Sequence, residues 1–154
     1  MLNICSKKNL KHAISNSIEI LIQQDNHQEC LNAIEKALAL SKESPPDPNI
    51  IALLGQGWVA EEALAISLYC ALCNQTDFQN GVLTAINHSG DSDSTGAITG
   101  NILGLILGES KFTKRWIDHL DLAPVVVQIS TDLYMLLEEG FGILNMDWFK
   151  KYPG

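Results

Sequence analysis

The chain has 154 residues, of which 46% are hydrophobic, and its 18 acidic and 10 basic residues give a formal net charge of −8. This length suits one domain with its own core, and the composition excludes a disordered chain. The Lys and Arg residues are scattered, so no nucleic-acid partner is expected. No segment is apolar for long enough to cross a membrane or to act as a signal peptide, so we expect no membrane association and a cytoplasmic location.

Apolar residues recur at helical spacing along most of the chain. The clearest break is residues 41–48, where prolines cluster and a helix cannot continue. The triplet Val125–Val127 could form a strand instead, although no partner strand is evident. The sequence therefore predicts an all-α protein of about seven helices. The periodic segments are residues 14–22, 31–38, 58–74, 78–86, 95–108 and part of 118–137.

Two of these helices have features that predict how they pack. The helix over 58–74 is apolar nearly all round and should be buried, with Cys70 and Cys73 in its core. All four cysteines, Cys5, Cys30, Cys70 and Cys73, are predicted to be free thiols. In the helix over 95–108, glycine recurs every four residues from Gly96 to Gly108. Each interior glycine costs a helix about 0.8–1 kcal/mol relative to alanine. A closely packed neighbouring helix is expected to offset that cost.

A polar stretch, residues 87–96, places two carboxylates and several hydroxyls where a helix is predicted to begin. Asp91, Asp93 and an adjacent hydroxyl could share a cation there, and such oxygen ligands favour Mg²⁺, Mn²⁺ or Ca²⁺ over Zn²⁺. The alternative needs no metal, because Asp and Ser also cap helix N-termini. An EF-hand is excluded, because its twelfth position, normally Glu, is Ile102.

Two motifs in this chain resemble those of the ADP-ribosylglycohydrolases, a family that includes ADP-ribosylarginine hydrolases. The family's C-terminal signature is similar to residues 87–101, NHSGDSDSTGAITGN, and its G-x-G-W-V-A-E-E-A-L segment is similar to residues 54–64, LGQGWVAEEAL. The resemblance implies a compact orthogonal bundle of helices that forms the C-terminal half of the family fold. We therefore expect a partial family domain over residues 1–139 and a separate tail over 140–154.

The resemblance also implies a metal centre. It assigns Asp91, Asp93 and Ser94 to a site for two Mg²⁺ ions, with Mn²⁺ as an alternative. Thr95 is the less suitable hydroxyl, because the family's ligand directly follows the second Asp. The implied activity is hydrolysis of the N- or O-glycosidic bond between ADP-ribose and its acceptor. Arginine, serine and other acceptors all stay open.

A substrate-binding loop is the second implication of the resemblance. It assigns Gly55, Gly57 and Trp58 to a loop that lines the cleft for ADP-ribose, and a role in contacting the ligand is considered for His88. Each aromatic residue has a structural alternative: Trp58 could belong to the core, and His88 could simply be hydrogen-bonded within its loop.

The chain departs from the family in one respect. The N-terminal half of family members supplies a Glu and a Thr-Asp-Asp cluster to the same metals, and nothing before Asp91 matches that cluster, since Asp25 and Asp47 stand alone. Three protein oxygens are few for ions that take about six ligands. We therefore expect half of an active site, which a separate chain carrying the N-terminal half could complete. The alternative is an inactive, truncated relative that binds nucleotide or a partner.

Overall fold

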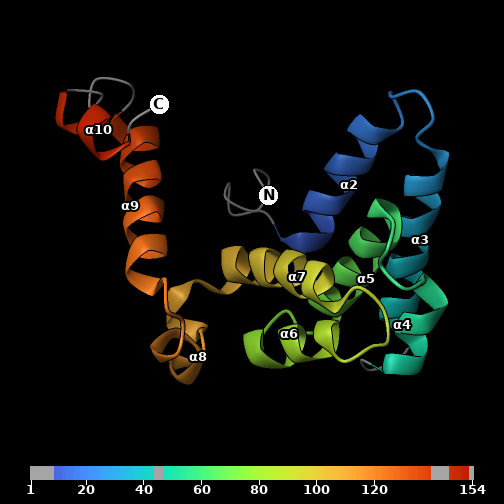
Figure 1. Ribbon diagram of the computed structural model, residues 1–154. Helices are drawn as coiled ribbons and strands as arrows, with labels where there is room; N and C mark the ends of the chain where they lie inside the picture. The colour runs from blue at the N-terminus through green and yellow to red at the C-terminus, as the bar shows by residue number, and fades with distance from the viewer. Residues whose placement is uncertain (1–8, 44–46, 140–145, 153–154) are drawn as a thin grey trace. The chain divides into compact units, whose positions relative to one another are not determined.

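The computed structural model describes residues 9–43, 47–139 and 146–152 (Figure 1). This described part consists of helices and the turns between them and contains no strand. The all-α prediction is confirmed. The chain divides into two compact units, residues 1–113 and 114–154. The boundary expected between residues 139 and 140 stays a prediction.

The described helices keep the labels of Figure 1. In the first unit they are α2 (Leu10–Leu21), α3 (Gln28–Glu43), α4 (Pro48–Leu54), α5 (Ala60–Cys73), α6 (Phe78–Ile86) and α7 (Ser92–Leu107), followed by a 3₁₀ turn (Glu109–Lys111). In the second unit they are α8 (Lys114–Asp118), α9 (Ala123–Glu139) and α10 (Met146–Lys151).

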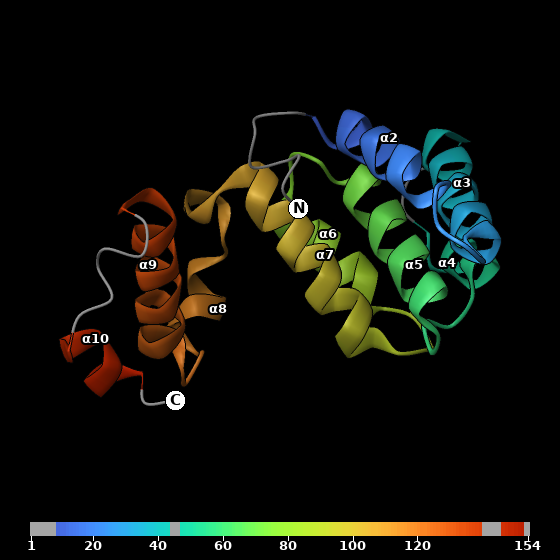
Figure 2. The same ribbon diagram turned by 90° about the horizontal axis from the view of Figure 1, so that it is seen from above.

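Helix α5 is the centre of the first unit. Figure 2 shows it between α3 and α7, and α6 packs along α7. Every residue of α5 from 65 to 72 is buried, so neighbouring elements cover the helix on all sides over that stretch. The prediction of a buried helix is confirmed. Because α5 contacts both α4 and α7, it is the framework on which the loops at the ends of those helices lie.

The thiols of α5 belong to this core. Cys70 is fully buried, Cys73 packs against the core cluster, and both are free thiols, as is Cys30. Burial is the main cause that raises the pKa of Cys70 to about 12, so the thiol stays uncharged and packs as a small apolar group. The prediction of free thiols is confirmed for these three residues, and Cys5 lies outside the described part.

Helices α4 and α7, whose ends lie near the two motifs, start at other residues than expected from the sequence. Helix α4 begins at Pro48, inside the predicted break, and no helix was expected there; residues 44–46 lie outside the described part. Proline is tolerated in a first helical turn, because its missing N–H would have no partner there. Asp47 caps this helix by accepting the N–H of Asn49 at 2.8 Å. Helix α7 begins at Ser92, three residues before the predicted start at Thr95.

The recurring glycines of α7 form a ridge, and the first two of them face α6. The ridge consists of Gly96, Gly100, Gly104 and Gly108. A Cβ added at Gly96 would lie 2.5 Å from Cγ2 of Ile86, so only glycine allows this approach. A Cβ at Gly100 would lie 3.8 Å from Cγ2 of Val82, which is an ordinary contact. The predicted close approach by a neighbouring helix is confirmed at Gly96.

The second half of the ridge does not meet a helix. Gly104 lies against the ring of Phe112, whose nearest atom would be 3.3 Å from an added Cβ. Gly108 ends the helix with a φ of 75°, a conformation that glycine adopts at little cost. The expectation of helix packing along the whole ridge is therefore wrong for these two glycines.

Alanine at two of these positions should change stability in opposite directions. Gly100→Ala should stabilise the first unit by about 0.8–1 kcal/mol, because it gains helix propensity without a clash. Gly96→Ala should destabilise it by about 1–2 kcal/mol, because the clash with Ile86 outweighs the same gain. Urea unfolding of both variants beside the wild type measures the difference. Equal effects would show that α6 does not constrain α7.

The second unit has a polar contact between α9 and α10. Asp132 accepts a hydrogen bond from Tyr152 and forms an ion pair with Lys151 at 2.5 Å. The triplet Val125–Val127 lies in α9, so the strand alternative is wrong. Among the described residues of α9, no apolar side chain is buried. Of the helices described in either unit, none has the length and apolar character needed to span a bilayer.

Candidate functional site at the start of helix α7

Asp91 caps the N-terminus of α7. Its carboxylate accepts the N–H of Ser94 at 3.4 Å, and its carbonyl accepts that of Thr95 at 3.3 Å. Asp93 lies in the first turn, where the helix dipole stabilises a negative charge. The helix cap considered as an alternative to metal binding is therefore present. The cap occupies only some of the lone pairs with which the Asp91 carboxylate can accept hydrogen bonds, so the remaining lone pairs are available to a ligand.

The two carboxyl groups of this turn interact with each other. The pKa of Asp91 lies below its ordinary value, first because of a side-chain hydrogen bond with Asp93 and then because of one with Ser94. Two carboxylates this close repel each other when both are ionised, and a cation between them removes that repulsion. In the described part of the chain, no three His, Cys, Asp or Glu side chains gather as a metal site. The pair can thus supply oxygens to one side of a cation.

His88 holds the turn that leads into α7. Its Nδ1 accepts the N–H of Gly90 at 3.1 Å, so the proton of the neutral ring is on Nε2, which donates to Oγ1 of Thr95 at 2.9 Å. Thr95 donates its own hydroxyl proton to the carbonyl of Ala85 at 2.7 Å. Thr95 is fully buried, so its hydroxyl serves the fold. The hydrogen-bonded role considered for His88 is present, and its contact with a ligand stays a prediction.

Removal of the hydroxyl group should change stability in opposite directions at two buried threonines of α7, Thr95 and Thr99, which lie one turn apart. Thr95→Val removes the bonds to Ala85 and His88 and should cost about 1–3 kcal/mol, since it leaves their polar atoms unpaired. Thr99 is equally buried, but its Oγ1 has no hydrogen-bond partner in the described structure. Thr99→Val keeps the branched shape and should raise stability by about 1 kcal/mol. Thermal melts of the two variants test this; a loss at Thr99 would mean that its hydroxyl is bonded after all.

The second motif forms a tight loop before α5. Gly55 and Gly57 have φ values of 120° and 81°, which favour glycine. The Glu62 carboxylate accepts the N–H groups of Gln56 at 3.0 Å and Gly57 at 3.1 Å. Trp58 is 67% exposed, and its indole N–H donates to Oε1 of Gln56 at 3.0 Å. The interpretation of Trp58 as a core residue is therefore wrong, since the loop presents its ring to solvent.

The two motif loops are in direct contact. The N–H of Asp91 donates to the carbonyl of Gln56 at 2.7 Å. A Cβ added at Gly90 would lie 1.8 Å from that carbonyl oxygen, so the two backbones meet at a glycine that leaves room for nothing larger. A Cβ at Gly57 would lie 3.1 Å from Cγ2 of Thr95 and 3.5 Å from Cβ of Asp91. Residues that are far apart in the sequence thus form one surface.

A cleft of about 540 Å³ lies beside this contact. Gly55 and His88 line it, whereas Gly57 and Trp58 lie in the adjoining loop. Asp91, Asp93 and Ser94 are not among the lining residues, and Gly90 separates Asp91 from the cleft-lining stretch 86–89. The remaining lining residues are Asn49, Ala52, Gln56, Ile86, Asn87 and Ser89.

The sequence prediction missed several residues of this site. Asn49 and Ala52 reach the cleft because α4 exists, and α4 is absent from that prediction. No role was predicted for Glu62, although it belongs to the second motif and lies in the first turn of α5. A Glu in that turn can reach back to backbone N–H groups ahead of the helix, as in a capping box, and this was the one signal available.

The fold and the site together define a class of protein: an all-helical domain in which an acidic helix start and a glycine-containing loop meet beside a cleft. The family model described as ADP-ribosylglycohydrolase matches residues 2–141, and the chain belongs to that family. A similar curated relative is the ADP-ribosylarginine hydrolase Tri1 of Serratia proteamaculans (strain 568), 36% identical over 72 residues. The alignment covers 46% of this chain and only 20% of that relative. No solved structure matches the chain.

Proposed function

We propose that this chain forms one wall of the ADP-ribose site in a hydrolase that removes ADP-ribose from a modified acceptor. The observation that carries the proposal is the hydrogen bond from the Asp91 N–H to the Gln56 carbonyl, which joins the family's two motifs beside the cleft. The cleft volume of about 540 Å³ falls in the range of small-molecule sites, about 300–1,000 Å³.

The donor set at the start of α7 fits Mg²⁺. The carboxylates of Asp91 and Asp93 and the hydroxyl of Ser94 are hard oxygen donors on adjacent residues of one turn. A metal ligand must be deprotonated, and the ordinary pKa of an aspartate already leaves it ionised at neutral pH. We propose that these three residues hold one side of a centre of two Mg²⁺ ions, which Mn²⁺ could replace, and that Thr95 serves the fold instead.

This chain's residues would bind and orient the substrate. A bound metal centre supplies a site for the ribose hydroxyls and a water, and it stabilises charge that develops at the anomeric carbon. Gly55 and Gln56 of the Gly55–Trp58 loop line the cleft, and the exposed ring of Trp58, whose N–H donates to Gln56, would offer an apolar face to a nucleotide. The ring of His88 lines the cleft in a fixed tautomer.

The site would be completed by residues that are not in this chain. Three protein oxygens leave about half of the ligand positions of a Mg²⁺ ion open. The 72 aligned residues amount to a fifth of the Serratia proteamaculans relative, so most of that protein has no counterpart in the alignment. We propose that an N-terminal half, on a separate chain or a longer one, contributes the other ligands.

A titration of the ¹⁵N-labelled chain tests this function. ADP-ribose in the presence of Mg²⁺ should shift the amide signals of residues 55–58 and 87–95 and the indole signal of Trp58, while the signals of α9 stay unchanged as an internal control. Magnesium alone should move only the signals around Asp91 and Asp93. No saturable response to ADP-ribose would contradict the proposal.

An activity assay distinguishes a half-site, which is active once it is completed, from an inactive relative that only binds nucleotide. The chain alone should release no ADP-ribose from ADP-ribosylated arginine or serine, because its metal centre is incomplete. Rapid release by the purified chain would refute the half-site. Saturable ADP-ribose binding without turnover, even when the remaining part of a family member is supplied, would favour the alternative of a nucleotide-binding relative.

A further inference from the structure

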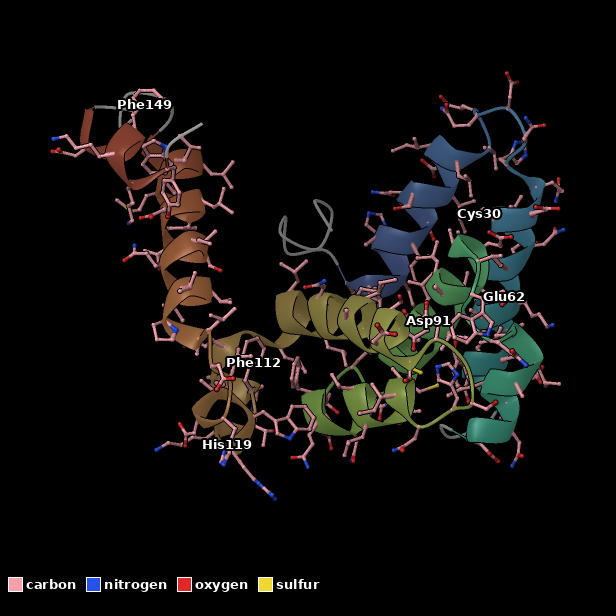
Figure 3. All side chains as sticks on the ribbon, viewed as in Figure 1. Cys30, Glu62, Asp91, Phe112, His119 and Phe149 are labelled. Atoms are coloured by element: carbon pink, nitrogen blue, oxygen red, sulfur yellow. The ribbon has the colours of Figure 1, made fainter. Side chains whose placement is uncertain are left out.

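Glu62, in the first turn of α5, holds the Gly55–Trp58 loop. One oxygen of its carboxylate accepts both the Gln56 N–H at 3.0 Å and the Gly57 N–H at 3.1 Å. Hydrogen bonds to an ionised acceptor are about twice as strong as those between neutral groups. Figure 3 labels Glu62 and Asp91, both in the first unit of the chain. The Glu62 side chain thus reaches back from the first turn of α5 to fix the loop before it.

Gly55, the first glycine of the motif, makes this reach possible. A Cβ added at Gly55 would lie 2.3 Å from Cδ of Glu62 and 2.6 Å from its Oε1. The backbone at Gly55 also has a φ of 120°, which a residue with a side chain rarely adopts. The motif glycine and the motif glutamate therefore depend on each other: the missing side chain leaves the space that the carboxylate occupies.

On its other side the loop touches the start of α7. The Gln56 carbonyl accepts the N–H of Asp91 at 2.7 Å, and Gly57 packs against Asp91 and Thr95. A continuous series of contacts therefore runs from the Glu62 carboxylate through two backbone amides to the backbone of Asp91. Glu62 itself is not among the residues that line the cleft.

We propose that Glu62 is a positioning residue that sets the backbone of Asp91 through the Gly55–Trp58 loop. The inference rests on the proposed function, because the placement of Asp91 has catalytic meaning only if that residue binds a metal. Glu62 does not line the cleft itself and acts through Gly55 and Gln56, which do. Its neighbour Glu61 is the natural comparison, because both loop N–H groups donate to Glu62.

Amide hydrogen exchange on the metal-free chain tests the series of contacts directly. In Glu62→Ala the Gln56 and Gly57 N–H groups lose their acceptor, and the Asp91 amide should exchange about tenfold faster through local opening. Glu62→Gln keeps one acceptor oxygen and should fall between Glu62→Ala and the wild type. Glu61→Gln is the matched control and should leave Asp91 unchanged. Amides in the core of α5, such as that of Ile66, should keep their rates in all three variants.

The outcomes separate this inference from the proposed function. An Asp91 amide that exchanges at the wild-type rate in Glu62→Ala overturns the inference. If Glu62→Ala does not fold, Glu62→Gln against Glu61→Gln gives the same comparison, and equal Asp91 exchange in the two overturns it. Faster Asp91 exchange in a variant whose wild-type parent does not bind ADP-ribose supports the contact series and refutes the function. Weaker ADP-ribose binding in Glu62→Gln than in Glu61→Gln supports both.

Discussion

The double variant Asp91→Asn, Asp93→Asn should lose nearly all magnesium-dependent turnover in an enzyme with a complete metal site. An amide oxygen carries no net charge, and these two carboxylates are the only charged ligands proposed on this side of the site. Loss of residues that merely support metal ligands costs about 10–100-fold in affinity or activity, so loss of both carboxylates should cost more than about 100-fold. Asparagine also caps helices well, so α7 should keep its stability.

The measurement requires a complete active site. A chimaera in which this chain replaces the matching portion of the Serratia proteamaculans hydrolase would supply one. Magnesium uptake is measured by calorimetry, and turnover by release of ADP-ribose from modified arginine. Asp77→Asn is the matched control, because Asp77 caps α6 through the N–H of Asn80 at 3.0 Å but does not line the cleft. Unchanged magnesium uptake in the double variant would remove the basis of the metal assignment.

The spacing of apolar residues predicted the helices that bury one face or are buried on all sides. The apolar spacing in α5 and α6 predicted both helices, since this signal is local. Helix α4 was missed because Pro48 and the two prolines before it read as a break, although a first helical turn accepts proline. The start of α7 was placed too late, because the run of Asp and Ser residues suits both a loop and a helical first turn.

The candidate site was predictable only in its parts. The sequence pointed to Asp91, Asp93 and the glycines of the Gly55–Trp58 loop through motif resemblance, and their functional roles stay predictions. It gave no indication that the Gln56 carbonyl meets the Asp91 N–H, because that contact depends on how α5 and α7 pack. It also could not show that Thr95 turns inward to Ala85, since hydroxyl direction follows from burial. Contacts between backbones leave almost no trace in residue type, except where they require glycine.

Gly90→Ala should separate the two motif loops. An added Cβ would lie 1.8 Å from the Gln56 carbonyl oxygen and 2.5 Å from its carbonyl carbon, and backbone atoms cannot move aside as a flexible side chain can. The loops must therefore part, and the hydrogen bond from Asp91 is lost with the contact. Overpacking and the lost bond together should cost about 2–4 kcal/mol of the free energy of unfolding. That is a large share of the roughly 5–15 kcal/mol typical of a domain.

Backbone strain does not explain this glycine, because Gly90 is not among the described residues with positive φ. Any loss of stability in Gly90→Ala therefore measures the contact with Gln56 itself. Ser89→Ala is the control, since Ser89 is exposed and adjacent but does not meet that carbonyl. Urea unfolding gives the stability, and the amide signal of Asp91 reports its hydrogen bond. If Gly90→Ala matched Ser89→Ala in both measurements, the loops would not touch in solution, and neither the cleft beside them nor the link from Glu62 to Asp91 would stand.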